Sequence, residues 1–184
     1  DECYINAGIY VLEPDAVAQI PAGRMVSIER ETFPALIERH GSLNHFPSDG
    51  LWADIGTFES YFAANFQLVA RRYAGGEDAL WGERSDCAVF KDLVYLNKSA
   101  RLDGRVDLFH RVIVMDGAAV GDGTRLQNCL VLPRAEIAAD TRLQDCLVCE
   151  GASVGPGEFA NLVFIGGEEP QPFYPETAQL LLDG

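Results

Sequence analysis

The sequence predicts two regions of different fold class: part of an α/β layer over residues 1–73, and a left-handed parallel β-helix of about four coils over residues 88–165. In the first region, short apolar runs alternate with helix-start signals, which is typical of α/β layers. In the second, apolar or small residues recur mostly every six positions, which is typical of stacked β-coils. Between them, the Gly- and charge-containing segment 74–87 is predicted as a linker. Residues 166–184 are predicted as a tail that contains a short helix.

The composition excludes several classes of function. The 184 residues are 48% hydrophobic and carry a formal net charge of −14. Nucleic-acid binding requires clustered Lys and Arg, and anionic lipid repels an acidic surface, so neither partner is expected. No apolar run reaches the roughly 20 residues of a membrane span. A phosphorylated substrate remains compatible, because a divalent metal and backbone N–H groups can hold phosphate in an acidic protein.

The first region begins with an expected strand and two expected helices. Tyr4–Leu12 is an apolar, β-prone run, and Pro14 suits the first turn of a helix that continues to Ile20. A second helix is expected over residues 28–40, with Ser27 as its N-cap and Gly41 at its end. Pro34 should kink this helix or separate its first turn.

The rest of this region is expected to form short strands at Phe46 and Leu51–Ile55, followed by a helix capped by Thr57. Its apolar face carries Tyr61, Phe62, Phe66, Val69 and Ala70. These elements are too few to close an α/β core, and the chain opens directly on an apolar run without Met. We therefore expect that it is part of a longer polypeptide.

The second region is predicted from paired inward positions that continue through twelve units. Four coils follow from twelve pairs on three faces. The segment 124–132, TRLQNCLVL, returns as TRLQDCLVC at 141–149, so Leu126 should stack on Leu143. Shortened steps are predicted at Leu132→Ile137 and at Cys149→Val154. The predicted inward pairs are Ala88/Phe90, Val94/Leu96, Ala100/Leu102, Val106/Leu108, Val112/Val114, Ala118/Val120, Thr124/Leu126, Leu130/Leu132, Ala135/Ile137, Thr141/Leu143, Leu147/Cys149 and Ala152/Val154.

The five cysteines are read as reduced thiols, because an odd number fits a cytoplasmic protein without a disulfide framework. Cys146 and Cys149 form a C-x-x-C pattern, but no second pair stands at zinc-like spacing. A metal or redox role for this pair is the minor alternative, and small hydrophobic positions in the coils are the main interpretation. Exposed ends of a stacked sheet must be covered, so residues 175–184 are expected to form a capping helix and the protein to be a homo-oligomer.

Three motifs followed by the coil repeats resemble the sugar-nucleotide pyrophosphorylases, in particular the mannose-1-phosphate guanylyltransferase-like branch. The motifs are INAGIYVLEPDAV from Ile5, VSIERETFP from Val26 and DGLWADIGTFESYFAAN from Asp49. The resemblance implies a nucleoside triphosphate and a sugar 1-phosphate as substrates, and Mg²⁺ as cofactor. It implies that Asp54 is one of two carboxylates that hold the metal, and that Asn6 and Gly8 bind the sugar.

Each of these residues also has a structural interpretation. Asp54 could cap the following helix, although Thr57 already suits that position. Asn6 could be a turn residue and Gly8 a strand bulge. The charged pair Glu29–Arg30 is interpreted as structural surface charge at a helix start. Trp52 is interpreted as a core anchor.

The resemblance implies that the family's phosphate loop, first metal-binding Asp, lysine and sugar-binding Glu lie upstream of Asp1, and we expect no catalytic residue in this chain. The chain alone is therefore predicted to be inactive. Two alternatives are a non-catalytic β-helix that serves oligomerisation or regulation, and a hexapeptide-repeat acyltransferase. The latter would use His110 as its base, because it is the only His in the repeats.

Overall fold

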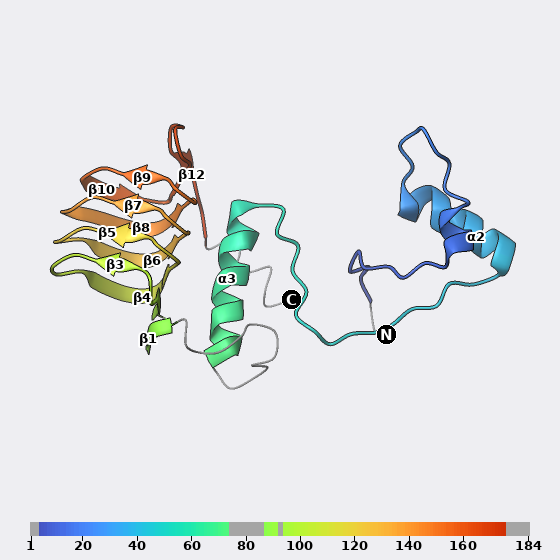
Figure 1. The fold of residues 1–184 in the computed structure, drawn as a ribbon, viewed down its shortest axis with the longest axis horizontal. Coiled ribbons are helices and arrows are strands. Elements are labelled where there is room, and N and C mark those ends of the chain that lie inside the picture. The colour runs from blue at the N-terminus through green and yellow to red at the C-terminus, as the bar shows by residue number, and fades with distance from the viewer. Residues whose placement is uncertain (1–3, 74–86, 92–93, 176–184) are drawn as a thin grey trace. The chain divides into compact units, whose positions relative to one another are not determined.

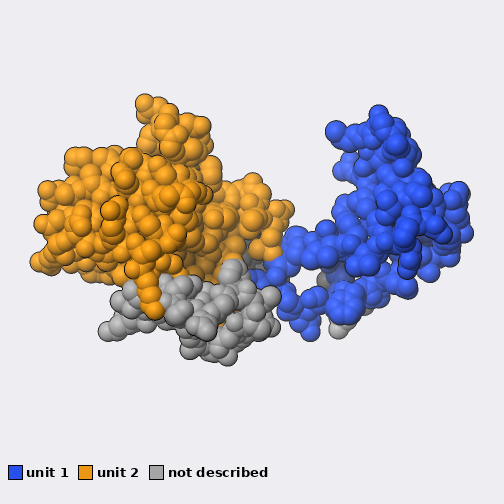
Figure 2. Space-filling view, in the orientation of Figure 1, with its two compact units in different colours: residues 1–52 blue, residues 53–184 orange. Residues whose placement is uncertain are grey.

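The computed structural model describes residues 4–73, 87–91 and 94–175, with side chains for all but residues 72–73 and 87–91 (Figure 1). The chain forms two compact units, residues 1–52 and residues 53–184, which Figure 2 distinguishes by colour. Each unit is described by itself below. The described ranges include no helix with both the length and the apolar composition needed to cross a membrane.

The first unit is helical. Its elements are α1 (Pro14–Val17), the π-helical turn η1 (Ile28–Thr32) and α2 (Phe33–His40). Both predicted ends of the longer helix are confirmed: the Ser27 hydroxyl accepts a hydrogen bond from the Arg30 N–H at 3.2 Å, and Gly41 ends α2 at φ +84°. The predicted effect of Pro34 is also confirmed. Because proline lacks an N–H, the ladder cannot run unbroken, and a wider π-type turn precedes the α-helix.

Four predictions for the segment up to residue 55 are wrong. The runs 4–12 and 51–55, and the position of Phe46, are not strands. An extended run becomes a strand only when a neighbouring strand completes its hydrogen bonds, and the described part of this unit offers no such partner. Trp52 is not a core anchor: it is 45% exposed, and its indole N–H donates to the carbonyl of Ala7 at 3.0 Å.

The second unit begins with the helix α3 (Phe58–Tyr73), which Thr57 caps as predicted. The Ser60 N–H donates to the Thr57 hydroxyl oxygen at 3.1 Å, and the Thr57 N–H lies 3.2 Å from the Ser60 hydroxyl oxygen. This reciprocal pair satisfies two backbone donors that have no partner within the helix. The helix therefore has a fixed first residue immediately after the segment that contains Asp54.

The rest of the second unit is a parallel β-helix of about four turns, so the predicted fold class is confirmed (Figure 1). One sheet has the order β1-β2-β4-β6-β8-β11-β12, with β10 also paired to β8, and a second sheet has the order β3-β5-β7-β9. The strands are β1 (Cys87–Lys91), β2 (Val94–Asn97), β3 (Arg101–Leu102), β4 (Asp107–Val114), β5 (Ala119–Val120), β6 (Arg125–Val131), β7 (Glu136–Ile137), β8 (Thr141–Val148), β9 (Ser153–Val154), β10 (Gly157–Ala160), β11 (Leu162–Phe164) and β12 (Gln171–Pro172).

Both ends of the larger sheet are closed by antiparallel strands, because β1 pairs with β2 and β12 pairs with β11 in that direction. The predicted first inward pair, Ala88/Phe90, therefore lies in a closing strand and not in a parallel coil; its side chains lie outside the described residues. The capping helix expected over residues 175–184 falls, apart from Pro175, outside the described residues as well. The closing strands cover edges that would otherwise offer unpaired backbone groups to another chain.

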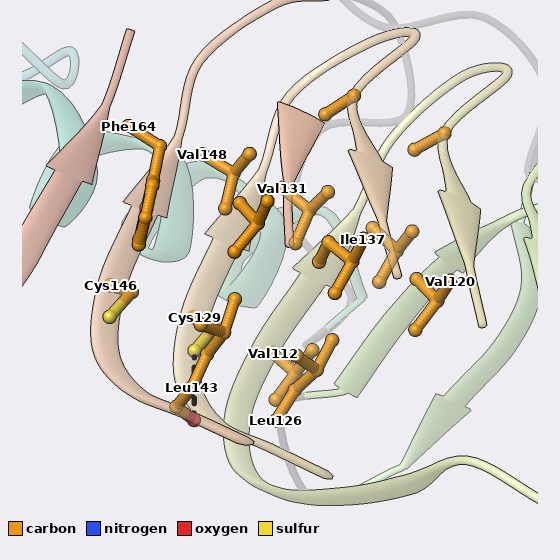
Figure 3. Close-up of a cluster of buried hydrophobic side chains, with 14 of the residues drawn as sticks. Val112, Val120, Leu126, Cys129, Val131, Ile137, Leu143, Cys146, Val148 and Phe164 are labelled. Atoms are coloured by element: carbon orange, nitrogen blue, oxygen red, sulfur yellow. Dashed lines mark hydrogen bonds between the residues drawn. The ribbon is translucent and has the colours of Figure 1, made fainter. Parts of the chain in front are cut away.

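The inside of the β-helix is a continuous apolar core. Leu126 lies in register with Leu143, as predicted, and Cys129 with Cys146 (Figure 3). The buried members of this inner core are Leu96, Val112, Val114, Ala118, Val120, Leu126, Cys129, Val131, Ala135, Ile137, Leu143, Cys146, Val148, Ala152, Val154 and Phe164.

Two predicted inward pairs are wrong by one position. The structure points Cys129/Val131 and Cys146/Val148 inward in place of Leu130/Leu132 and Leu147/Cys149. The shortened step therefore occurs earlier, at Asn128 and at Asp145, and not between Leu132 and Ile137. Both residues take left-handed backbone angles, φ +50° and φ +53°, at this corner of the coil.

The leucines that were predicted to point inward form a second core on the outer face of the large sheet. Leu130, Leu147 and Val163 pack there against α3, whose Phe62 and Phe66 are 1% and 5% exposed. The ring of Phe62 lies 4.8 Å from that of Phe66 and 5.2 Å from that of Phe173. The apolar face predicted for this helix thus serves to dock it on the β-helix.

Candidate functional site

Asn6 lies in a closed set of hydrogen bonds in the first unit. Its side-chain N–H groups donate to the Tyr10 hydroxyl at 2.8 Å and to a carboxylate oxygen of Glu29 at 2.8 Å. The Tyr10 hydroxyl donates to the same Glu29 oxygen at 2.9 Å. The Asn6 carbonyl oxygen accepts from the Gly8 N–H at 2.9 Å. The two residues predicted to bind a sugar are therefore brought together, in a turn stabilised by Asn6.

Glycine suits position 8 because of its backbone conformation, and not because a side chain would lack space there. Its φ is +72°, and a Cβ built there would meet no atom within 4 Å. A side chain would therefore be disfavoured by the left-handed conformation itself. This geometry agrees with the structural interpretation of Asn6 as a turn residue, and it leaves the predicted sugar contact as a prediction.

Sequence reasoning missed Tyr10 and Glu29 as partners of this site. Glu29 was interpreted as surface charge, whereas it accepts a hydrogen bond from Asn6. Because 23 positions separate the two residues, no local pattern in the sequence indicates this contact. Partial burial, together with the hydrogen bond and the negative charge of Glu29, raises the pKa of Tyr10 against the opposing effect of Asn6. The phenol thus stays protonated and able to donate.

Asp54 lies in the second unit and is exposed. One of its carboxylate oxygens accepts a hydrogen bond from the Gly56 N–H at 3.0 Å, while Thr57 caps the helix. The capping interpretation of Asp54 is therefore wrong. The short turn fixes the direction of the carboxylate, and within the described residues its second oxygen has no hydrogen bond.

Mg²⁺, which the resemblance implies, would find only part of its ligands here. Within the described residues, no group of three or more His, Cys, Asp or Glu side chains could hold a metal. Mg²⁺ is commonly bound through one or two carboxylates, with phosphate oxygens and water completing its shell. A single exposed carboxylate such as Asp54 fits that role as one ligand among several.

A cleft of about 410 Å³ lies between the start of α3 and the outer face of the β-helix. Its lining is mostly apolar and consists of Ile55, Gly56, Thr57, Phe58, Glu59, Tyr61, Leu132, Leu147 and Cys149. Gly56, which donates to Asp54, is one of these residues. Burial raises the pKa of Cys149, so this thiol is not activated as a nucleophile.

The C-x-x-C pattern does not form a site. Cys146 points into the inner core, where burial raises its pKa to about 11, whereas Cys149 contacts both cores and lines the cleft. The cysteines whose side chains are described, Cys129, Cys146 and Cys149, are free thiols. The interpretation as small hydrophobic positions is therefore confirmed for Cys146 and Cys129.

One pentapeptide, Gly121–Arg125, has the glycine-rich pattern G-x-G-x-R, which a phosphate loop can also show, although the family's phosphate loop is expected upstream of Asp1. In the structure it joins β5 to β6 as a corner of the β-helix. The Gly121 N–H donates to the Ile137 carbonyl at 2.8 Å, and a Cβ on Gly121 would lie 2.4 Å from the backbone N of Ala139. No helix follows to supply a phosphate site, so the glycines serve coil stacking.

His110, the base of the acyltransferase alternative, is exposed at a corner of β4 with φ +59°. Its conformation gives it a structural purpose, because it continues the corner that Asn128 and Asp145 form in the following coils. No hydrogen bond orients its ring in the described part of the chain. The structure thus offers no support for acyl transfer.

Comparison with known proteins shows what the first region of the chain is similar to. Residues 1–71 match the family model for nucleotidyl transferases. Residues 1–71 are therefore similar to nucleotidyl transferases, and the predicted resemblance to sugar-nucleotide pyrophosphorylases is confirmed.

Among individual relatives, a mannose-1-phosphate guanylyltransferase of Mycobacterium tuberculosis is 35% identical over 128 residues, covering 69% of this chain and 33% of the relative. A mannose-1-phosphate guanyltransferase of Aspergillus fumigatus is 30% identical over 128 residues, 70% of this chain and 34% of the relative. A putative one of Sulfolobus acidocaldarius is 26% identical over 127 residues, 69% of this chain and 30% of the relative. The chain thus spans about a third of the length of these relatives.

Proposed function

We propose that this chain supplies sugar- and metal-binding residues and a β-helix to a sugar-1-phosphate nucleotidyltransferase. The enzyme would form an NDP-sugar of the GDP-mannose type and pyrophosphate from a nucleoside triphosphate and a sugar 1-phosphate. The observation that carries the proposal is the match of residues 1–71 to nucleotidyl transferases, combined with relatives named mannose-1-phosphate guanylyltransferases. The cysteine count favours a cytoplasmic location.

The proposed roles follow from the chemistry of the reaction. Attack of a sugar phosphate oxygen on an α-phosphorus brings two anions together, and Mg²⁺ supplies the positive charge that offsets their repulsion. Asp54 would be one of its ligands, because its carboxylate is exposed and its direction is fixed by Gly56. Asn6 and Gly8 would contact the sugar. The remaining ligands and the phosphate-binding groups are proposed to lie outside this chain, which would be inactive alone.

The test is a pyrophosphate-release assay with GTP, Mg²⁺ and several sugar 1-phosphates. The isolated chain is expected to give no turnover, while the full-length gene product is expected to give turnover with mannose 1-phosphate. Turnover by the isolated chain would refute its proposed inactivity. A full-length protein that releases no pyrophosphate with any sugar 1-phosphate would refute the proposed reaction.

For the β-helix we propose a non-catalytic role in rigidity and in homo-oligomer formation. Some of its described charged side chains pair across neighbouring coils, as in Arg142 with Glu158 at 2.6 Å. Size-exclusion chromatography with light scattering tests this role. A monomer at high protein concentration would count against it.

A further inference from the structure

We propose that Glu29 and Tyr10 are positioning residues that fix the side-chain amide of Asn6, so that its carbonyl oxygen is presented to a hydroxyl group of the bound sugar. This inference rests on the proposed function, because it takes the ligand of Asn6 to be the sugar 1-phosphate. It adds that the sugar hydroxyl donates the hydrogen bond and the Asn6 carbonyl oxygen accepts it, and that Glu29 and Tyr10 set this direction.

The direction follows from the chemistry of the partners. An ionised carboxylate can only accept hydrogen bonds, so Glu29 requires that the NH₂ end of the Asn6 amide faces it. The Tyr10 hydroxyl lies 2.8 Å from the same nitrogen. Both partners therefore lie at the NH₂ end of the amide and leave its carbonyl end to other contacts. Its carbonyl oxygen accepts from the Gly8 N–H and keeps a second lone pair, so it can bind only a donor such as a sugar hydroxyl.

The two positioning residues are themselves held in place. Glu29 lies in η1, whose start is capped by Ser27. The ring of Tyr10 packs edge-on against Phe33, the first residue of α2, with 4.9 Å between ring centroids and an interplanar angle of 78°. The loop that carries Asn6 is thereby tied to the helical segment by charge-assisted and aromatic contacts.

The first arm of the test uses the chain as it is and needs no activity. In wild type, the side-chain amide of Asn6 should give one pair of sharp ¹H–¹⁵N signals, assigned by their loss in N6A. E29Q should shift or broaden this pair, because glutamine can offer either a donor or an acceptor. E38Q is the matched control. Glu38 is an exposed residue of α2, and its replacement removes the same charge at a position that does not contact Asn6. An unchanged Asn6 signal in E29Q would overturn the positioning role.

The second arm uses the full-length enzyme with GTP and mannose 1-phosphate. E29Q and N6D should each raise the KM for the sugar 1-phosphate about tenfold, the effect of one lost ligand hydrogen bond, and leave the KM for GTP unchanged. In N6D the new carboxylate faces that of Glu29, and the two repel each other. In the double variant N6D/E29Q, the glutamine NH₂ can donate to the new carboxylate, so the sugar KM should return to within about threefold of wild type.

These outcomes separate the inference from the proposed function. Additive losses in the double variant, or an equal rise of the KM for GTP and for the sugar, would overturn the inference and indicate a general structural role. An inactive wild-type full-length protein would overturn the proposed function, and with it the sugar as the ligand. In that case the amide signals of the first arm still decide whether Glu29 orients Asn6.

Discussion

Replacement of Phe62 by Ala tests how α3 is held on the β-helix. The side chain is 1% exposed and packs between two aromatic rings, Phe66 at 4.8 Å and Phe173 at 5.2 Å. Burial of a phenylalanine side chain contributes about 1.5–3 kcal/mol, and each aromatic pair adds roughly 0.5–1.5 kcal/mol. With the cavity that alanine leaves, the loss in free energy of unfolding should be about 3–5 kcal/mol.

The assay is urea unfolding followed by circular dichroism in the β-sheet region, with the same change at Phe109 as control. Phe109 lies on β4 and is 42% exposed, and its main described ring contact is with the Arg125 guanidinium at 5.2 Å. Its replacement by Ala should lower the free energy of unfolding by only about 0.5–1 kcal/mol. If F62A is no more destabilising than F109A, then the helix does not contribute a second core and the description of the outer face is wrong.

Three further predictions concern thiols, corners and pH. Near pH 8 a thiol reagent should label Cys149 well before Cys129 and Cys146. The latter two are fully buried, and burial raises their pKa values. Equal labelling of the three thiols in peptide mass maps would contradict the inward placement of Cys129 and Cys146. N128A should lower the free energy of unfolding by roughly 1–3 kcal/mol, because it removes the side-chain hydrogen bond to Asp145 and forces alanine to adopt φ +50°. N128G should lower it by less, because glycine adopts this angle without strain. Equal losses in urea unfolding would show that backbone strain is not involved. Hydrogen bonds from Arg24 and from the Ser27 N–H lower the pKa of Glu31, so its stabilising effect is present above its ordinary pKa of 4.5 and is lost as the pH falls through the lowered value. E31Q should therefore loosen η1 at neutral pH but not in acid, as measured by amide hydrogen exchange, and a difference that persists in acid would contradict this cause.

The β-helix could be predicted from the sequence because each coil repeats the same inward positions, and Leu126 and Leu143 lie in register as expected. The phase was wrong at Leu130 and Leu147 because these outward residues are as apolar as the inward ones. A strand that is buried on both faces shows no alternation of polar and apolar residues. Only the docking of α3, which is remote in sequence, explains why leucine faces outward here.

The helix ends could also be predicted, because Ser27 and Thr57 act within three residues of their partners. The partners of Asn6 could not. Glu29 is 23 positions away, and its contact with Asn6 depends on how the loop returns to η1. The strands expected at 4–12 and 51–55 are absent for a related reason: each depends on contacts that are remote in sequence. A β-prone run forms a strand only beside a hydrogen-bonding neighbour, which its own sequence does not specify.

The most direct test of the account is GDP-mannose formation by the full-length gene product with GTP, mannose 1-phosphate and Mg²⁺, compared among wild type, D54N and D49N. Asp49 is a matched control, because it is an exposed aspartate five positions before Asp54. The account predicts activity in wild type and D49N, and a loss of at least about 100-fold in D54N, as expected when a group that stabilises transition-state charge is removed. Equal activity in D54N and D49N would contradict the assignment of Asp54 to the metal site.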